Sequence, residues 1–167
     1  SQFLMTNTSS ALKSIPVFSA LTDGEIDQLA GSTFLQSFQR GDILFREGDE
    51  GDVFFAVISG RVKIFKSSPE GKEQILHVFG AGEMIGEVAV FTSGSFPASA
   101  EGIDSGVVLR TPREVLLSMV RKNPDLAFRM LATLSKRLHR FAALIEDLSL
   151  REVPARLTAY LLGLRPV

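Results

Sequence analysis

The chain has no cysteine and no tryptophan, and only one tyrosine and two histidines among its 167 residues. Without cysteine it can form neither a disulfide nor a thiolate metal site, so iron–sulfur clusters held by cysteine are excluded. No segment has the run of about 18 uninterrupted apolar residues that a membrane-spanning helix requires. The first residues also lack a basic start followed by an apolar stretch, so nothing in them indicates export. We therefore expect a cytoplasmic protein with no membrane partner.

The net charge of the chain also says little about its function. The chain carries 18 basic and 19 acidic residues, so its net charge of −1 gives no whole-chain sign of a nucleic-acid binder. The distribution is uneven, because 11 basic residues stand against 5 acidic ones from Arg110 onward. Most of them fall in a helical stretch, and this pattern is typical of a solvated helix face.

The chain is rich in apolar residues, which make up 45% of it and include thirteen phenylalanines. That fraction is ample for a buried core, and the length suits one domain with a helical appendage. Between Phe34 and Leu109 the apolar pattern has the period of strands, with glycine and aspartate turns between them. Many short strands with turns at this frequency favour a sandwich or jelly roll over a parallel α/β sheet. The expected strands are 34–38, 43–45, 52–59, 61–66, 74–79, 98–100 and 106–110.

Helices are expected on both sides of this region. Near the start, Thr22 followed by Glu25 fits a capping box at the beginning of a short helix. After the strands, Pro112 opens a helix over 113–121, and Asn123-Pro124 then opens a much longer one, with Asn123 as its N-cap. Along this helix the apolar residues are spaced 3, 4, 3, 4 and 3, a heptad seam that predicts dimerisation. The seam consists of Leu131, Leu134, Leu138, Phe141, Ile145 and Leu148. A last helix is expected over Val153–Leu164.

The stretch from Gly82 to Ala100 reads GEMIGEVAVFTSGSFPASA, with two glycine–glutamate pairs, an apolar run and a Gly-Ser turn. It resembles the phosphate-binding cassette of cyclic-nucleotide-binding domains. Two further segments, Arg40–Asp49 and Val57–Lys63, and then Asn123-Pro124 follow the same family order. The chain is therefore similar to the sensor half of bacterial regulators of the cyclic-AMP receptor protein / fumarate–nitrate regulator (Crp/Fnr) superfamily.

This resemblance implies a mainly β fold with helices: a jelly-roll barrel, short N-terminal helices and a long C-terminal dimerisation helix. It divides the chain into a sensor domain (1–122), a dimer helix (123–150) and a hinge with the first helix of a DNA-binding domain (151–167). The helix-turn-helix that reads DNA in the family is not within this sequence, and we expect that the chain is truncated before it. The implied partners are a second copy of the chain, promoter DNA through that domain, RNA polymerase and a small-molecule effector.

The resemblance also implies a ligand site, but with a departure in its chemistry. In the family the turn at Gly86, Glu87 and Val88 donates backbone N–H groups to a phosphate, and an arginine about ten residues on neutralises it. Here Pro97 occupies that position, and Ala98 replaces the neighbouring hydroxyl. A buried phosphate without a counter-charge is unfavourable. The remaining expected ligand contacts are Phe96, Ser99, Phe141 and Ala142, the last two at the adenine end. We therefore expect that cyclic AMP is not the effector, whose identity stays unknown.

Three alternatives stay open. The first is a haem cofactor in a sensor of nitric oxide or carbon monoxide, for which only His77 and His139 could supply imidazole ligands. The second is a cyclic-nucleotide-binding regulatory subunit of a kinase or a channel. The third is a jelly-roll enzyme, but the chain has too few metal ligands for a cupin-type centre and no nucleophile-elbow pattern. We expect no catalytic residues, no other metal ligand and no enzyme activity.

Overall fold

The computed structural model describes residues 2–161, with side-chain environments given between residues 7 and 149. The chain divides into two compact units, with the boundary between Ala127 and Phe128. Each unit is described by itself below.

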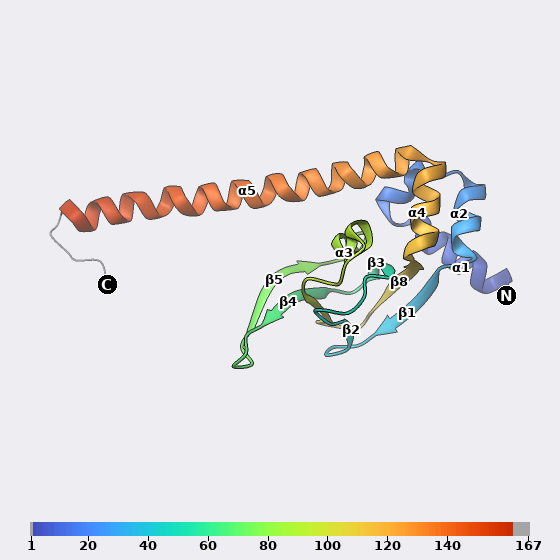
Figure 1. Ribbon diagram of the computed structural model, residues 1–167, viewed down its shortest axis with the longest axis horizontal. Helices are drawn as coiled ribbons and strands as arrows, with labels where there is room; N and C mark the ends of the chain where they lie inside the picture. The colour runs from blue at the N-terminus through green and yellow to red at the C-terminus, as the bar shows by residue number, and fades with distance from the viewer. Residues whose placement is uncertain (1, 162–167) are drawn as a thin grey trace. The chain divides into compact units, whose positions relative to one another are not determined.

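The first unit contains three helical segments, then the strands with one short helix among them, then another helix (Figure 1). The helical segments are α1 (Gln2–Lys13), the 3₁₀ helix η1 (Pro16–Ala20), α2 (Asp23–Ala30), α3 (Glu87–Thr92) and α4 (Arg113–Lys122). The strands are β1 (Phe34–Phe38), β2 (Ile43–Phe45), β3 (Val53–Ser59), β4 (Val62–Ser67), β5 (Glu73–Phe79), β6 (Met84–Ile85), β7 (Ser99–Gly102) and β8 (Gly106–Pro112).

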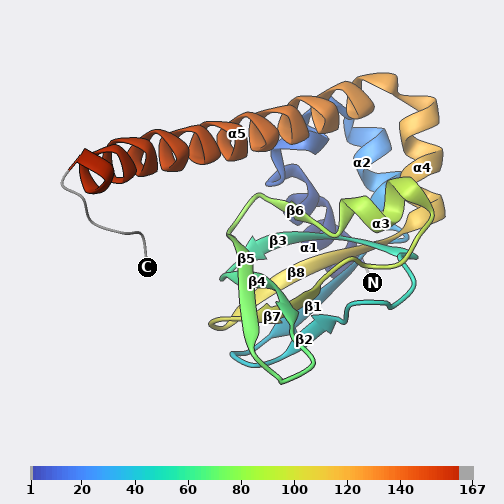
Figure 2. The ribbon, with the colours of Figure 1, turned by 60° about the vertical axis from the view of Figure 1, so that its left-hand side comes forward.

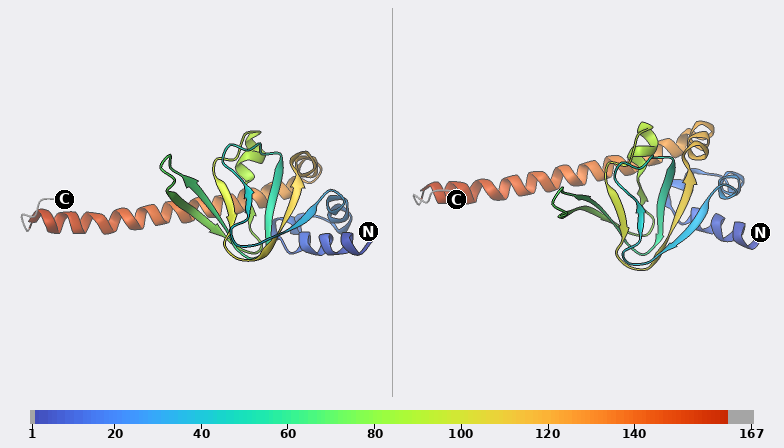
Figure 3. Two further views of the ribbon diagram at one scale, coloured as in Figure 1. Left: turned by 90° about the horizontal axis from the view of Figure 1, so that it is seen from below. Right: turned by 60° about the horizontal axis from the view of Figure 1, so that its bottom comes forward.

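The strands form two four-stranded antiparallel sheets, with the orders β1-β8-β3-β6 and β2-β7-β4-β5. Figures 2 and 3 show the two sheets facing each other around a common interior. Several neighbouring strands are far apart in sequence, as in β1 with β8 and β2 with β7, whereas β4 and β5 are consecutive. This is the jelly-roll barrel that the sequence predicted, and the fold class is confirmed.

Phenylalanine fills the interior of the barrel. One buried cluster includes Phe38, Phe45, Phe55, Phe79 and Phe96, contributed by strands of both sheets and by the loop after α3. The rings of Phe45 and Phe96 are stacked, with centroids 3.9 Å apart and planes within 13° of parallel. Such aromatic pairs stabilise a core beyond the area that they bury.

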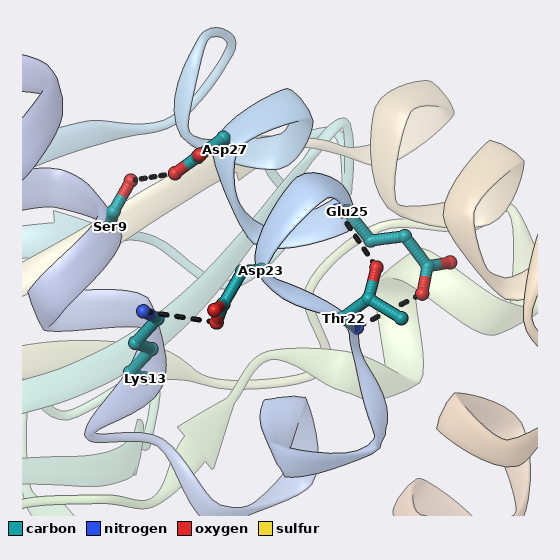
Figure 4. A network of polar contacts seen from close by, with 6 residues as sticks. All are labelled: Ser9, Lys13, Thr22, Asp23, Glu25 and Asp27. Atoms are coloured by element: carbon teal, nitrogen blue, oxygen red, sulfur yellow. Dashed lines mark hydrogen bonds and ion pairs between the residues drawn. The ribbon is translucent and has the colours of Figure 1, made fainter.

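The N-terminal helices pack on the other face of the first sheet, where Phe18 of η1 meets Phe54 of β3 edge to face at 6.1 Å. The predicted capping box is present: Thr22 Oγ1 accepts from the Glu25 N–H, and Glu25 Oε1 accepts from the Thr22 N–H. Figure 4 shows this box beside two contacts that join α1 to α2, one from Ser9 to Asp27 and one from Lys13 to Asp23.

The helix α5 runs from Pro124 to Leu161, which corrects one prediction. We expected a hinge after residue 150 and a separate helix over Val153–Leu164, because proline removes a backbone donor and disfavours a helix interior. In the described part of that range, up to Leu161, the helix continues through Pro154. The flanking leucine, arginine, glutamate and alanine residues are strong helix formers, and one missing bond does not end so long a helix.

The strands were predicted with uneven success. The strands β1 and β2 have the predicted bounds, and Gly71 at the β4–β5 turn has the positive φ, 85°, that this turn needs. The two-residue strand β6 was not predicted, because so short a segment carries no visible period.

Candidate functional site

The cassette segment forms a strand, a tight turn and a short helix. The strand β6 pairs with β3, so that Ile85 lies opposite Phe55. Gly86 follows with φ of 74°, a left-handed conformation that a side chain disfavours. A Cβ atom at Gly86 would also lie 2.7 Å from Cε1 of Phe96. The left-handed backbone conformation and the lack of room for a side chain therefore both require glycine at this position. The helix α3 begins at the next residue, Glu87.

A cavity of about 110 Å³ lies at this turn. Its lining is almost entirely apolar, which is unsuited to an unpaired charge. The lining residues are Phe45, Ile64, Phe79, Gly86, Glu87, Val88, Phe96, Pro97 and Ala98. The structure therefore brings together six of the residues predicted from the cassette and adds three from the strands β2, β4 and β5. Those three were missed because the alternation of a strand shows that a residue faces inward, but not which part of the interior it reaches.

The remaining predicted ligand contacts are Ser99, Phe141 and Ala142. Ser99 does not line the cavity, and its Oγ accepts the backbone N–H of Glu47 at 2.9 Å, so its part is to fix the loop after β2. Phe141 and Ala142 are on α5, in the second unit, and both are exposed there. Their place at the adenine end stays a prediction.

The loop after α3 is fixed by backbone bonds to the loop before β3. The Gly51 N–H donates to the Gly94 carbonyl at 3.0 Å, and the Phe96 N–H donates to the Asp49 carbonyl at 2.9 Å. Gly51 packs so closely on α3 that a Cβ there would lie 2.2 Å from the Cβ of Ala89. The stacked Phe96 is therefore held in place by its backbone as well as by its ring.

Arg113, the first residue of α4, reaches back to the end of α3. Its Nε donates to the Val90 carbonyl at 2.6 Å, and one terminal nitrogen donates to Ser93 Oγ at 2.5 Å. The other terminal nitrogen pairs with Glu114 at 2.7 Å. The sequence marks this arginine only as one of the basic residues of a helical stretch, because nothing in its spacing to residue 90 indicates a contact.

The side chains whose pKa values are shifted lie away from the cavity. The hydrogen bond from Lys63 to Glu101, supported by one to Glu73, raises the pKa of the Lys63 ammonium. The Arg61 side chain lowers the pKa of Asp104 by hydrogen bonding to its carboxylate. These pairs fasten neighbouring strands and loops, so they belong to the scaffold and not to a reactive centre.

The two predicted haem ligands lie in different units and have different surroundings. His77 packs edge-on against Phe79, with ring centroids 4.4 Å apart, whereas His139 is exposed on α5. The part of either histidine as a haem ligand stays a prediction. Within the described residues, no group of three or more histidine, cysteine or acidic side chains could hold a metal ion.

Residues 35–123 match the family described as the cyclic nucleotide-binding domain, and they include the whole cassette, Arg113 and α4. The chain belongs to this family. Among residues 2–161, no helix is both long and apolar enough to cross a membrane.

The domain is similar to two curated regulators. One is the CRP-like cAMP-activated global transcriptional regulator of Mycobacterium tuberculosis, 35% identical over 127 residues, which are 76% of this chain and 57% of that protein. The other is the fumarate and nitrate reduction regulatory protein of Salmonella typhi, 30% identical over 145 residues, which are 86% of this chain and 58% of that protein. The chain thus spans little more than half the length of each. These relatives confirm the predicted kinship with the Crp/Fnr regulators.

A solved structure supports the same conclusion. The sensor domain of the transcriptional regulator DNR from Pseudomonas aeruginosa is 30% identical, with a TM-score of 0.71. The match covers 81% of this chain and 91% of that sensor domain. A jelly-roll sensor domain is therefore the unit to which the present chain corresponds.

Proposed function

We propose that this chain is the effector-sensing domain of a dimeric, DNA-binding transcription regulator, in which occupation of the barrel cavity is coupled to α5. The observation that supports this most is the combination of a family cassette, bordering a cavity, with a long helix whose heptad seam is exposed. The relatives named above are transcription regulators. Because a transcription regulator acts by binding its ligands and responding to them, we assign no catalytic step to this chain.

The exposed seam of α5 is the basis for the proposed dimer. Leu138 and Ile145 are 71% and 65% exposed, and Leu131, Phe141 and Leu148 are exposed as well. Large apolar side chains at heptad spacing stabilise paired helices by packing as knobs into holes. A second copy of this chain supplies the matching seam, so we propose a homodimer through α5.

We propose that the effector is not cyclic AMP, although the Mycobacterium relative is described as cAMP-activated. The cavity is small and apolar, and Pro97 lines it at the position where the family resemblance places the arginine that neutralises the phosphate. Losing one hydrogen bond between charged groups weakens binding by about 1.5–3 kcal/mol. Titration calorimetry with cyclic AMP and cyclic GMP tests this. We expect a Kd above about 100 μM for both nucleotides. A Kd in the micromolar range for either nucleotide would refute the proposal.

We propose that DNA is read by a helix-turn-helix domain outside this chain, at promoters in the cytoplasm and together with RNA polymerase. The test uses a longer protein in which that domain follows α5. Fluorescence anisotropy should then detect binding to upstream promoter fragments, whereas the present chain binds DNA weakly and without sequence preference. Mass spectrometry of small molecules that copurify with the longer protein should identify the effector. If the longer protein binds no promoter DNA, with or without its copurified ligand, the regulator proposal fails.

A further inference from the structure

The helix α4 lies between two polar contacts, one at each end, both within the first unit. At its start, Arg113 is bonded to the end of the cassette helix α3. At its end, Asn123 Nδ2 donates to the Ala20 carbonyl at 3.1 Å and to Glu25 Oε1 at 3.2 Å, which ties it to the N-terminal helices. Asn123 Oδ1 also accepts the Asp125 N–H at 3.2 Å, at the start of α5. The ten residues of α4 therefore join the cassette to the helix on which the dimer seam lies.

The contact at Arg113 is directional and partly buried. Its side chain is only 21% exposed, and its guanidinium uses separate nitrogens for Val90 and Ser93. The last carbonyls of a helix have no partner within the helix, and Arg113 satisfies the one at Val90. Its own backbone N–H donates to the Asp52 carbonyl at 2.8 Å, so the start of α4 is also fixed to the residue that precedes β3. A planar fork of this kind holds an orientation that a lysine ammonium cannot.

A second, independent observation points to the same place. Ser93 has φ of 55°, and among the described residues it is the one non-glycine residue with positive φ. A residue persists in such a conformation only where its surroundings hold it there, and strained residues of this kind gather at switches and ligand clamps. Ser93 is the C-cap of α3, and its hydroxyl is the atom that Arg113 binds. The end of the cassette helix is thus both strained and fastened.

We propose that Arg113 is the positioning residue that makes α4 follow any displacement of α3, while Asn123 acts as the fixed point about which α4 turns. This rests on the proposed function, because only a sensor whose cavity is coupled to α5 needs such a link. Arg113 does not line the cavity, so its role is to pass on a movement of the cassette and not to contact the effector. A substitution there should loosen α3 against α4 without altering the α4–α2 contact.

The absence of cysteine makes this measurable with pairs of introduced cysteines that carry spin labels. One pair, Thr92→Cys with Ser118→Cys, reports α3 against α4; a reference pair, Gln28→Cys with Arg121→Cys, reports α2 against α4. All four positions are exposed. In Arg113→Gln we expect the width of the α3–α4 distance distribution at least to double, with the reference pair unchanged. Arg113→Lys, which keeps the charge but not the fork, should fall in between.

Two further variants separate positioning from general destabilisation. Asn123→Ala should broaden the α2–α4 distance distribution and leave the α3–α4 distribution narrow, the reverse of Arg113→Gln. Glu114→Gln, which removes only the charge of the exposed partner of Arg113, should change neither. The inference is overturned if Arg113→Gln leaves the α3–α4 distribution unchanged or broadens both distributions equally. The measurement needs neither DNA nor effector, so its failure is distinct from failure of the regulator proposal.

Discussion

The barrel and α5 are both rich in large apolar side chains, yet they place them in opposite environments. In the barrel, Phe38 and Phe55 are each 2% exposed and pack against apolar residues from both sheets. On α5, Leu138 and Ile145 project from the helix surface and are mostly exposed. Composition alone does not distinguish the two regions, because the same residue types serve both.

This difference in exposure shows that the barrel buries its large apolar side chains within the chain, whereas the seam of α5 stays exposed. A barrel closes two sheets over one interior, so its inward side chains find partners within the chain. A single helix has no interior and can bury an apolar seam only against another element. We therefore expect the barrel to determine the stability of the folded chain and the α5 seam to determine its association.

The largest effect should come from deleting an aromatic ring inside the barrel. Phe55 lies 5.4 Å from Phe45 and 6.3 Å from Phe96, ring centroid to centroid, so Phe55→Ala leaves a cavity among these rings. We expect a loss of about 3–5 kcal/mol in the free energy of unfolding, measured by urea denaturation. The matched control is Phe34→Ala, whose ring is 66% exposed and which should cost about 0.5 kcal/mol or less. Equal losses at the two positions would contradict the proposed contrast.

The next effect concerns association and not folding. Leu138→Asp places a carboxylate in the proposed seam, where a paired helix would bury it without a partner. We expect the solution mass at tens of micromolar to fall from dimer to monomer, with at least about a hundredfold weaker association. The urea midpoint of the barrel should stay the same. Lys136→Asp introduces the same charge two residues away, outside the seam, and should leave the dimer intact. A wild-type monomer, or an unchanged mass in Leu138→Asp, would remove the dimer proposal.

A smaller effect is expected on the affinity of the apolar cavity for a charged ligand. The double substitution Pro97→Arg with Ala98→Ser restores the cation and hydroxyl that the family resemblance places at these positions. One charge-assisted hydrogen bond adds about 1.5–3 kcal/mol, so affinity for cyclic AMP should rise by roughly 10- to 100-fold in calorimetry. Ala98→Ser alone is the control and should gain far less. No gain in the double variant would mean that cavity size, and not the missing charge, excludes the nucleotide.

The smallest effect concerns a polar contact on the surface of the first unit. The hydrogen bond from the Thr22 N–H, followed by that from Asn123, holds the pKa of Glu25 below its ordinary value. Because the folded pKa is the lower one, this contribution is present above pH 4.5 and is lost as the pH falls through the folded pKa. Glu25→Gln should therefore be slightly less stable than wild type at neutral pH and should approach it below pH 4.5. Parallel thermal unfolding between pH 3 and 7 measures this; a constant difference at every pH would contradict it.

Much of the local structure could be predicted from the sequence. The capping box at Thr22 and the cassette turn at Gly86 each depend on a few adjacent residues whose chemistry admits one local conformation. The extent of α5 could not be predicted, because the effect of Pro154 depends on how strongly the rest of the helix is favoured.

The sequence by itself determined the family, the order of the strands other than β6, and the heptad pattern of α5, since these follow from periodicity and from motifs read in order. Only the tertiary structure decided that Phe96 stacks on Phe45, that the cavity is as small as about 110 Å³, and that Arg113 fastens the end of α3. Each of these joins residues that lie 20 or more positions apart. Such contacts depend on strand register and on the packing of whole elements, which no local pattern of residues specifies.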